Sequence, residues 1–518
     1  MAEHLPVLVI VIPLMSAVII PLAGRANSLY SWYITVAVTF SCFLISSSLL
    51  NTVMNTGRIS YWLGGWEPPW GIEYVIDYLN GFVLVVVSFI LFIVSLYARK
   101  SIEMEIDEDK TTTFYSIYLL FAAGLMGIIN TGDIFNLYVF IEIASLAGYA
   151  LIAAGRKREA LMASYNYLIL GTIAATFILL GIGYLYMATG TLNMADLREK
   201  LPALYDSKVV LTAFAFFTVG LSLKLALFPL HIWLPNAYAY SPSVVGAVMA
   251  ATATKVGAYA MLRIMFTVFR VDFDPEAVPV TKILLVLSSI AIIAGSVLAI
   301  AQTTIKRMLA YSSVGQIGYI VLGAALVNQT AMTGSILHIL NHALMKGTLF
   351  LATGAVVYKT GIDDISGLRG MGRKMPFSMA AFTIGGLSMI GVPLTVGFVS
   401  KWYIAVGALN AGMWYFVPVI LLSSLLTTVY FWRIIESIYF PRKTKDRGQG
   451  AGGRGQNTER RTQSADINTP ESEIYGEAPL GMLIPTLILA GLCIFFGVAA
   501  FLPVSVAEKT AAMLLGGM

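Results

Sequence analysis

Cysteine is almost absent from this chain of 518 residues. Its two cysteines, Cys42 and Cys493, each lie inside an apolar run, so the chain has no disulfide framework, no CxxC zinc pair and too few thiolates for an iron–sulfur cluster. A Walker A loop, a GxGxxG motif after a strand, an HExxH pair and a GxSxG elbow are also missing. We therefore expect no metal, no cofactor and no catalytic site of the chain's own.

Charged side chains are scarce too. Asp, Glu, Lys and Arg make up 12% of the residues while hydrophobic residues make up 58%, a balance that no ordinary soluble domain shows. The apolar runs are continuous over about 20 residues instead of alternating, which is typical of transmembrane helices and excludes an outer-membrane barrel. The sequence predicts an all-α polytopic membrane protein, because an open sheet cannot sit in lipid.

Fourteen apolar stretches are long enough to cross a bilayer. The predicted spans are 5–24, 30–51, 79–98, 112–130, 133–154, 161–188, 209–236, 243–268, 280–301, 308–327, 331–358, 375–407, 412–437 and 479–503. Lys and Arg concentrate in alternate loops, so the positive-inside rule assigns those loops to the cytoplasm. Both termini of this multi-pass protein are then predicted to lie outside.

Two spans are interrupted by proline. Pro229 in span seven and Pro393 in span twelve each remove a backbone donor and clash with the preceding turn, so both helices should break. The two prolines lie at nearly the same distance from the starts of spans four and nine. This match predicts two five-helix repeats, the second inverted relative to the first, as in secondary transporters. An incidental kink in each span is the alternative.

The predicted organisation has five parts. They are N-terminal helices 1–3 over 1–111, a first repeat of helices 4–8 over 112–268, a second repeat of helices 9–13 over 280–437, a loop over 441–476 and a C-terminal helix 14 over 479–518. The Gly, Arg, Gln and Asn content of the loop predicts a flexible cytoplasmic segment. We do not interpret it as a nucleic-acid-binding segment.

Seven ionisable side chains fall deep inside the predicted spans, where an unpaired charge is costly. They are Glu142, Lys224, Lys255, His338, His342, Lys346 and Lys401. The two histidines and the lysine of span eleven are spaced by four residues, which places them on one helix face. A single membrane lysine can extend its amine to a headgroup, but the whole set is too large for that unless its members converge on a hydrated interior path.

The chemistry of these groups suits protons. A low dielectric favours the neutral forms of lysine and glutamate and pairing favours the charged forms, so a neighbour's charge can change the protonation state. Histidine titrates near neutrality. A sodium site would need several oxygen ligands without a competing cation, whereas here one deep carboxylate accompanies several lysines.

Three further residues have weaker assignments. His231 either packs and caps the broken helix or takes part in the proton path. Asp77 and Asp133 stand at predicted helix starts, where an acid complements the helix dipole, and Asp133 is kept as an accessory candidate.

Three segments resemble a known family. They are SLKLALFPLHIWLPNAYAYSPSVVGAVMAATATKVGAY at 222–259, IKRMLAYSSVGQIGYI at 305–320 and HILNHALMKGTLF at 338–350. The chain resembles, over nearly its whole length, the antiporter-like proton-translocating subunits shared by respiratory complex I, Mrp-type Na+/H+ antiporters and archaeal membrane-bound hydrogenases. The resemblance implies fourteen helices, two inverted repeats and discontinuous helices 7 and 12 in the cytoplasmic membrane of a prokaryote.

The resemblance also implies roles for the deep ionisable residues. Glu142 and Lys224 match the family's switchable ion pair, Lys255 matches its helix-eight lysine, and the stripe of span eleven matches its titratable centre. Lys401 matches the exit residue, and a lysine there resembles the D-type subunit of Mrp antiporters. The implied partners are other membrane subunits of an Mrp-like or hydrogenase-like complex, together with the lipid bilayer.

Two other classes of function stay open. A quinone-reactive subunit of a redox complex would need a reduction site or cluster ligands, which the sequence lacks. A structural membrane scaffold would not explain the mid-membrane charge. Whether the chain is part of an oxidoreductase, which parent complex contains it, what drives it and in which direction it pumps are not decided by the sequence.

Overall fold

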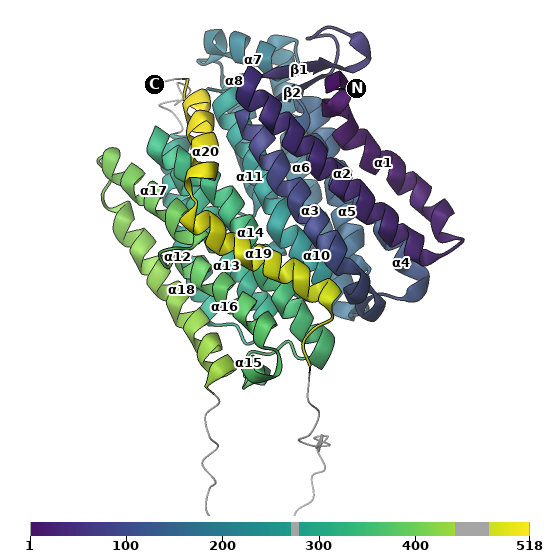
Figure 1. Ribbon diagram of the computed structural model, residues 1–518. Coiled ribbons are helices and arrows are strands. Elements are labelled where there is room, and N and C mark those ends of the chain that lie inside the picture. The colour runs from purple at the N-terminus through teal and green to yellow at the C-terminus, as the bar shows by residue number, and fades with distance from the viewer. Residues whose placement is uncertain (1, 271–278, 441–475, 517–518) are drawn as a thin grey trace, which may run out of the picture.

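The computed structural model describes residues 2–270, 279–440 and 476–516. Apart from its last residue, the predicted loop 441–476 lies outside them. The described segments form one helical bundle, drawn from the N-terminus in purple to the C-terminus in yellow (Figure 1).

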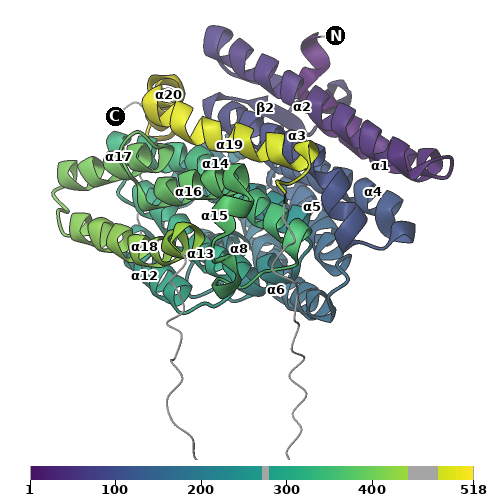
Figure 2. The same ribbon diagram turned by 60° about the horizontal axis from the view of Figure 1, so that its bottom comes forward.

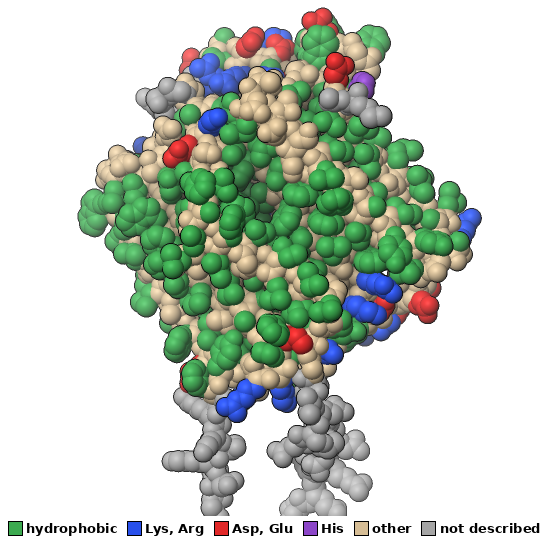
Figure 3. All heavy atoms as spheres, viewed as in Figure 1, with side chains coloured by type: hydrophobic (Ala, Val, Ile, Leu, Met, Phe, Trp, Pro, Cys, Tyr) green, Lys and Arg blue, Asp and Glu red, His purple; other side chains and the backbone are tan. Residues whose placement is uncertain are grey.

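Twelve helices of the described segments are long and apolar enough to cross a membrane. They are α1 (Leu5–Gly24), α2 (Ser28–Thr56), α3 (Tyr78–Glu105), α4 (Thr111–Asn130), α5 (Ile134–Ala153), α6 (Arg158–Thr189), α8 (Lys208–Leu225), the continuous run of α10 (Ser243–Val248), η5 (Met249–Ala253), α11 (Thr254–Arg263) and η6 (Ile264–Val268), α12 (Val280–Ile300), α13 (Ile305–Ala325), α18 (Phe416–Tyr439) and α19 (Leu480–Val498). Hydrophobic side chains cover the middle of the molecule and charged ones gather toward its two ends (Figure 3). The chain is a multi-pass membrane protein, as its composition predicted.

The central helix is not among the twelve. Helix α14 (Gln329–Thr360) has 32 residues and is almost completely buried, and its polar side chains make it less apolar than the other spans. It packs against α3, α13, α19 and the two halves of the second broken span, α16 (Pro376–Ile390) and α17 (Val396–Asn410). A polar helix can lie at membrane depth here because protein surrounds it.

Both spans that were predicted to break are discontinuous. Helix α8 ends at Leu225 and α9 (Trp233–Tyr240) begins after a turn segment that contains Pro229. In the same way, Pro393 lies in the non-helical segment between α16 and α17. The structure thus contains two pairs of half-helices, and the helices of each pair end inside the bundle.

The predicted C-terminal helix over 479–518 is wrong as a single element. Helix α19 ends at Val498, and a separate helix, α20 (Phe501–Leu514), follows it. Pro503 explains the break, because its ring would clash with the carbonyl of residue 499 in a continuous helix. In Figures 1 and 2, α19 crosses the bundle obliquely over α14 and α3, on which it packs.

The all-α description also omits one small sheet. Strands β1 (Ile59–Trp62) and β2 (Glu73–Ile76) form an antiparallel hairpin between α2 and α3. Gly64 and Gly65 adopt positive φ in the connection, which glycine allows. The hairpin lies at one end of the bundle, outside the spans, so the rule against open sheets in lipid does not apply to it.

Short helices complete the described segments. They are η1 (Ala2–His4), η2 (Leu63–Gly65), η3 (Glu108–Lys110), α7 (Met194–Lys200), η4 (Leu201–Leu204), η7 (Ser366–Leu368) and α15 (Met371–Lys374). The hairpin and α7 lie at the same end of the bundle as both termini, and α15 lies at the opposite end (Figure 1).

Candidate functional site

The first helix break positions Lys224 on the last turn of α8. Ala226 follows in the left-handed region with φ 61°, which ends the helix. The indole Nε1 of Trp233, from the start of α9, donates to the Leu223 carbonyl at 2.9 Å. This bond satisfies one carbonyl that the broken helix leaves unpaired and holds the two half-helices together.

Lys224 faces Glu142 of α5. Its Nζ lies 3.6 Å from Glu142 Oε1 and donates to Ser145 Oγ at 2.7 Å. The Lys224 side chain is 9% exposed, but the Glu142 side chain is 27% exposed. The lysine is therefore buried and the glutamate only partly so, although the Glu142 Oε1 atom that faces the lysine is itself buried.

A small cavity extends from Lys224 to the next charged helix. It has a volume of about 40 Å³, and Ser145, Ala253 and Gly257 are among the residues that line it. Most of its lining is apolar, and its polar groups are those of Ser145, Tyr167 and Lys224, beside which a cavity of this size has room for a water molecule. The cavity joins Lys224 on α8 to the backbone on both sides of Lys255.

Lys255 is fully buried at the start of α11. The π-helical turn η5 comes directly before it, and π turns inside α-helices occur often at functional sites. The Nζ folds back to donate to the Ala250 carbonyl in this turn and lies 3.4 Å from Thr254 Oγ1. The described residues offer this amine no carboxylate.

Two histidines continue the set on α14. The His338 ring bonds Ser400 Oγ at 2.8 Å and Gln316 Oε1 at 3.1 Å, and which nitrogen donates depends on its tautomer. The His342 ring lies 6.0 Å away, measured between ring centroids, and neither of its nitrogens has a hydrogen-bond partner among the described residues. The ring is fully buried, so the described residues leave both of its nitrogens unsatisfied inside the bundle.

Lys346 occupies the next position of the same stripe. Its Nζ donates to the Leu309 carbonyl at 2.6 Å and to Ser312 Oγ at 2.5 Å, both on α13. Helix α14 packs against η5 and α11, the elements that hold Lys255. The stripe predicted on span eleven is therefore present, and it meets the charge of α11.

The second helix break holds Lys401. This residue lies on the second turn of α17, and its Nζ donates to the carbonyls of Met389 and Ile390 at 2.9 and 3.0 Å. It also bonds Ser424 Oγ at 3.2 Å and lies 5.0 Å above the Tyr319 ring. The carbonyls that end α16 thus bind the ammonium group, as expected for the negative end of a helix dipole.

The accessory candidates lie outside this chain of contacts. Asp133 caps α5 by accepting from the Asn136 amide at 2.7 Å, and burial raises the pKa of its carboxyl above the usual range. Asp77 caps α3, so both acids fit the helix-start interpretation. His231 stacks on Phe228 with the ring centroids 5.1 Å apart, and its Nδ1 has no partner among the described residues.

Sequence reasoning missed one buried ion pair. Arg263 of α11 binds Asp77 through Nη1–Oδ2 and Nη2–Oδ1 at 2.6 and 2.9 Å, and its Nε lies 3.2 Å from the Tyr259 hydroxyl. Lys255, Tyr259 and Arg263 are spaced by four residues on one helix face, a pattern that could have identified the arginine. The pair connects α11 to the first turn of α3.

The chain is similar to known membrane proteins over most of its length. The family described as "NADH:quinone oxidoreductase/Mrp antiporter, TM" matches residues 131–427, more than half of the chain. The chain is 45% identical to NADH-quinone oxidoreductase subunit N of Desulforudis audaxviator, with 94% of each chain covered. It is 30% identical to the D subunit of the Na(+)/H(+) antiporter of Bacillus subtilis, with 83% of this chain and 85% of that protein covered. A chain of the archaeal membrane-bound sulfane sulfur reductase superposes with TM-score 0.87 at 31% identity, covering 99% of this chain and 98% of that one.

Proposed function

Since the chain belongs to the NADH:quinone oxidoreductase/Mrp antiporter transmembrane family, we propose that it is the proton-translocating subunit of a multisubunit Mrp-type or complex I-like membrane complex. One observation carries the proposal: a set of buried lysines and histidines runs through the middle of the bundle with a single carboxylate at one end. Such a set has no structural purpose in a membrane scaffold, where an apolar core would be more stable.

The proposed path begins at the Glu142–Lys224 pair and passes through the small cavity toward the backbone next to Lys255. It continues through His342 and His338 of α14. Lys346 of the same helix is proposed to influence the charge of His342. The amine at the second helix break, Lys401, ends the path within electrostatic reach of His338.

The chemistry of the path favours H+ over Na+. The described residues contain no group of three or more His, Cys, Asp or Glu that could hold a metal ion. The single carboxylate has an ammonium group 3.6 Å away, which would repel a metal cation. Moving one charge against 100 mV costs about 2.3 kcal/mol, so a partner subunit supplies the energy by changing the relative stability of the charge states.

The proposed topology counts fourteen spans. Adding α14 to the twelve apolar helices and counting α16 and α17 as one interrupted span gives this number, with α8 and α9 forming the other interrupted span. The two breaks support inverted repeats over 112–268 and 280–437. The positive-inside rule then places both termini outside and α15 in the cytoplasm.

The parent complex is proposed to be redox-driven. The higher identity to a quinone oxidoreductase subunit, 45% against 30% for the antiporter subunit, favours this choice. Purification in mild detergent tests it: iron–sulfur partner proteins support a redox complex, whereas partners without any redox centre point to a sodium/proton antiporter.

Substitution of Lys255 tests the mechanism. Arg keeps the charge but stays protonated, so Lys255→Arg in the intact complex should lower proton pumping by at least about tenfold in vesicles that report internal pH. Because the site is fully buried, Lys255→Met serves as a second variant that adds no volume, and it should also stop the relay. Exposed Lys282, on the first turn of α12, provides the control Lys282→Arg, which should pump normally. Parental pumping by Lys255→Arg would rule out deprotonation of this lysine as a step.

A further inference from the structure

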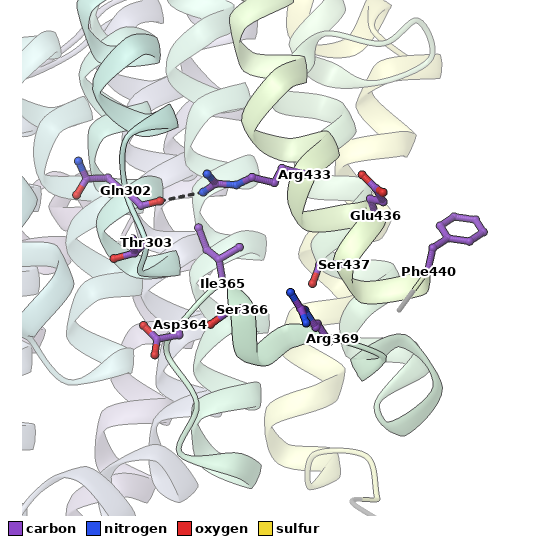
Figure 4. Close-up of a pocket in the computed structure, with 10 residues that line it drawn as sticks. All are labelled: Gln302, Thr303, Asp364, Ile365, Ser366, Arg369, Arg433, Glu436, Ser437 and Phe440. Carbon is purple, nitrogen blue, oxygen red and sulfur yellow. Dashed lines mark hydrogen bonds between the residues drawn. The ribbon is translucent and has the colours of Figure 1, made fainter. Parts of the chain in front are cut away.

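A second polar cavity lies at the α15 end of the bundle, away from the proton path. It has a volume of about 490 Å³ and opens between the turn that joins α12 to α13, the segment 364–369 and the last turns of α18 (Figure 4). The topology proposed above places this end in the cytoplasm, so the cavity lies at the level of the inner headgroups.

Two arginines face the cavity from different elements. Arg433 of α18 donates to the carbonyls of Gln302 and Ile300 at 2.9 and 3.4 Å, which fixes its guanidinium and leaves further N–H donors unused. Arg369 follows η7 and makes no side-chain hydrogen bond or ion pair within the described residues. In Figure 4 the two guanidinium groups lie on opposite sides of the same opening, with Ser437 beside Arg369.

Two acids line the same cavity. Asp364 stands at its inner side and Glu436 at its outer edge, on α18 (Figure 4). Two cations and two acids balance, so the cavity is poorly suited to a ligand that carries only negative charge. A group with one phosphate and one ammonium matches both signs, because arginine pairs well with phosphate and carboxylate with ammonium.

The outer surface of α18 leads directly into this cavity. Leu425, Val429 and Trp432 are exposed large hydrophobic residues, and Glu436 follows them at the same helical spacing. In Figure 3 the flank that α18 forms is covered by hydrophobic side chains. An acyl chain lying along this face would bring its headgroup to Glu436 and the two arginines.

We propose that the cavity binds the headgroup of a phospholipid with a primary amine, that is, a phosphatidylethanolamine. Its phosphate sits between Arg369 and Arg433, and its ammonium group binds Glu436. The site is independent of the proton path and of the function proposed for it.

Lipid binding to the purified complex tests the site. The complex is exchanged into detergent with phosphatidylethanolamine or phosphatidylglycerol, and bound lipid is counted by native mass spectrometry. Arg369→Gln should weaken phosphatidylethanolamine binding by about tenfold, the effect of one charge-assisted hydrogen bond. The control Arg373→Gln changes an exposed arginine at the same end of the bundle that does not line the cavity, and binding should not change.

A second variant tests the choice of headgroup. Glu436→Gln removes the partner of the amine, so the preference should shift from phosphatidylethanolamine to phosphatidylglycerol. Arg433 is left intact because it also binds the last carbonyl of α12. Unchanged lipid binding by Arg369→Gln, an unchanged preference in Glu436→Gln, or displacement of the lipid by millimolar inorganic phosphate would each overturn the proposal.

Discussion

The two helix breaks hold their lysines in different ways. Lys224 precedes the first break and faces a carboxylate at 3.6 Å and a hydroxyl at 2.7 Å. Lys401 follows the second break and binds two backbone carbonyls and a hydroxyl, with no acid among its described partners. One ammonium group is balanced by a full charge and the other by dipoles only.

This difference separates two roles for the same residue type. The charge next to Lys224 belongs to the side chain of Glu142, which is 27% exposed. The carbonyls around Lys401 cannot change charge. The first lysine therefore has a charged partner that a substitution can remove, and the second has only backbone dipoles and a hydroxyl.

The largest expected effect concerns the ion pair. Glu142→Gln and Lys224→Met in the intact complex should each lower proton pumping by at least about tenfold, because each leaves a deep partner unpaired. The double variant should be no worse than either single one, since the two groups act together. The control is Glu159→Gln, an exposed acid on the first turn of α6, which should pump normally. Losses that simply multiply in the double variant would show that the two groups act independently.

The next effect concerns the contribution of each lysine to the thermal stability of the protein. Lys401→Met should also stop pumping, but it leaves no charge unpaired and costs about 1–3 kcal/mol for the carbonyls it deprives of a donor. Because Lys401 has no charge partner, its effect on the thermal midpoint should add to that of Glu142→Gln. Thermal unfolding in detergent measures this, and a strong coupling between these two substitutions would contradict the difference between the two breaks.

The backbone of the two breaks should differ as well. Gly391 has φ 90°, and a Cβ there would lie 3.1 Å from Lys401 Cδ, so Gly391→Ala should destabilise the protein by roughly 1–2 kcal/mol. Ala226 already accepts φ 61° at the first break. Ala226→Gly relieves that conformation while it increases the freedom of the unfolded chain, so its effect should stay within about 1 kcal/mol. Equal losses of thermal stability in both variants would argue against a difference in backbone strain between the two breaks.

The smallest effects concern the hydroxyls. Ser145→Ala removes the one uncharged hydrogen-bond partner that the described part of the chain gives Lys224, at 2.7 Å, and should slow pumping several-fold. Ser424→Ala removes a longer bond of 3.2 Å and leaves two carbonyls on Lys401, so it should change the rate by less than about twofold. Initial pumping rates compare the two directly, and the reverse order would mean that the second lysine depends more on its hydroxyl.

Local features of the sequence were sufficient for much of the fold. Apolar runs of about 20 residues identified the spans because burial in lipid depends on composition over a short window. Pro229 and Pro393 lie where helices end, because a missing N–H and a ring clash act within one turn. Proline alone is not decisive, because Pro485 lies inside the continuous α19 whereas Pro503 lies in the first turn of the separate α20. The short hairpin at 59–76 was overlooked because it lies outside the spans.

The sequence by itself placed seven ionisable groups inside predicted spans, three of them at four-residue spacing on one helix. Only the tertiary structure decided what each group contacts. Ser145 precedes Lys224 by 79 residues, and Asp77 precedes Arg263 by 186. A helix fixes the direction of its own side chains, but the packing of distant helices decides whether a lysine meets a carboxylate, a carbonyl or a cavity with room for water.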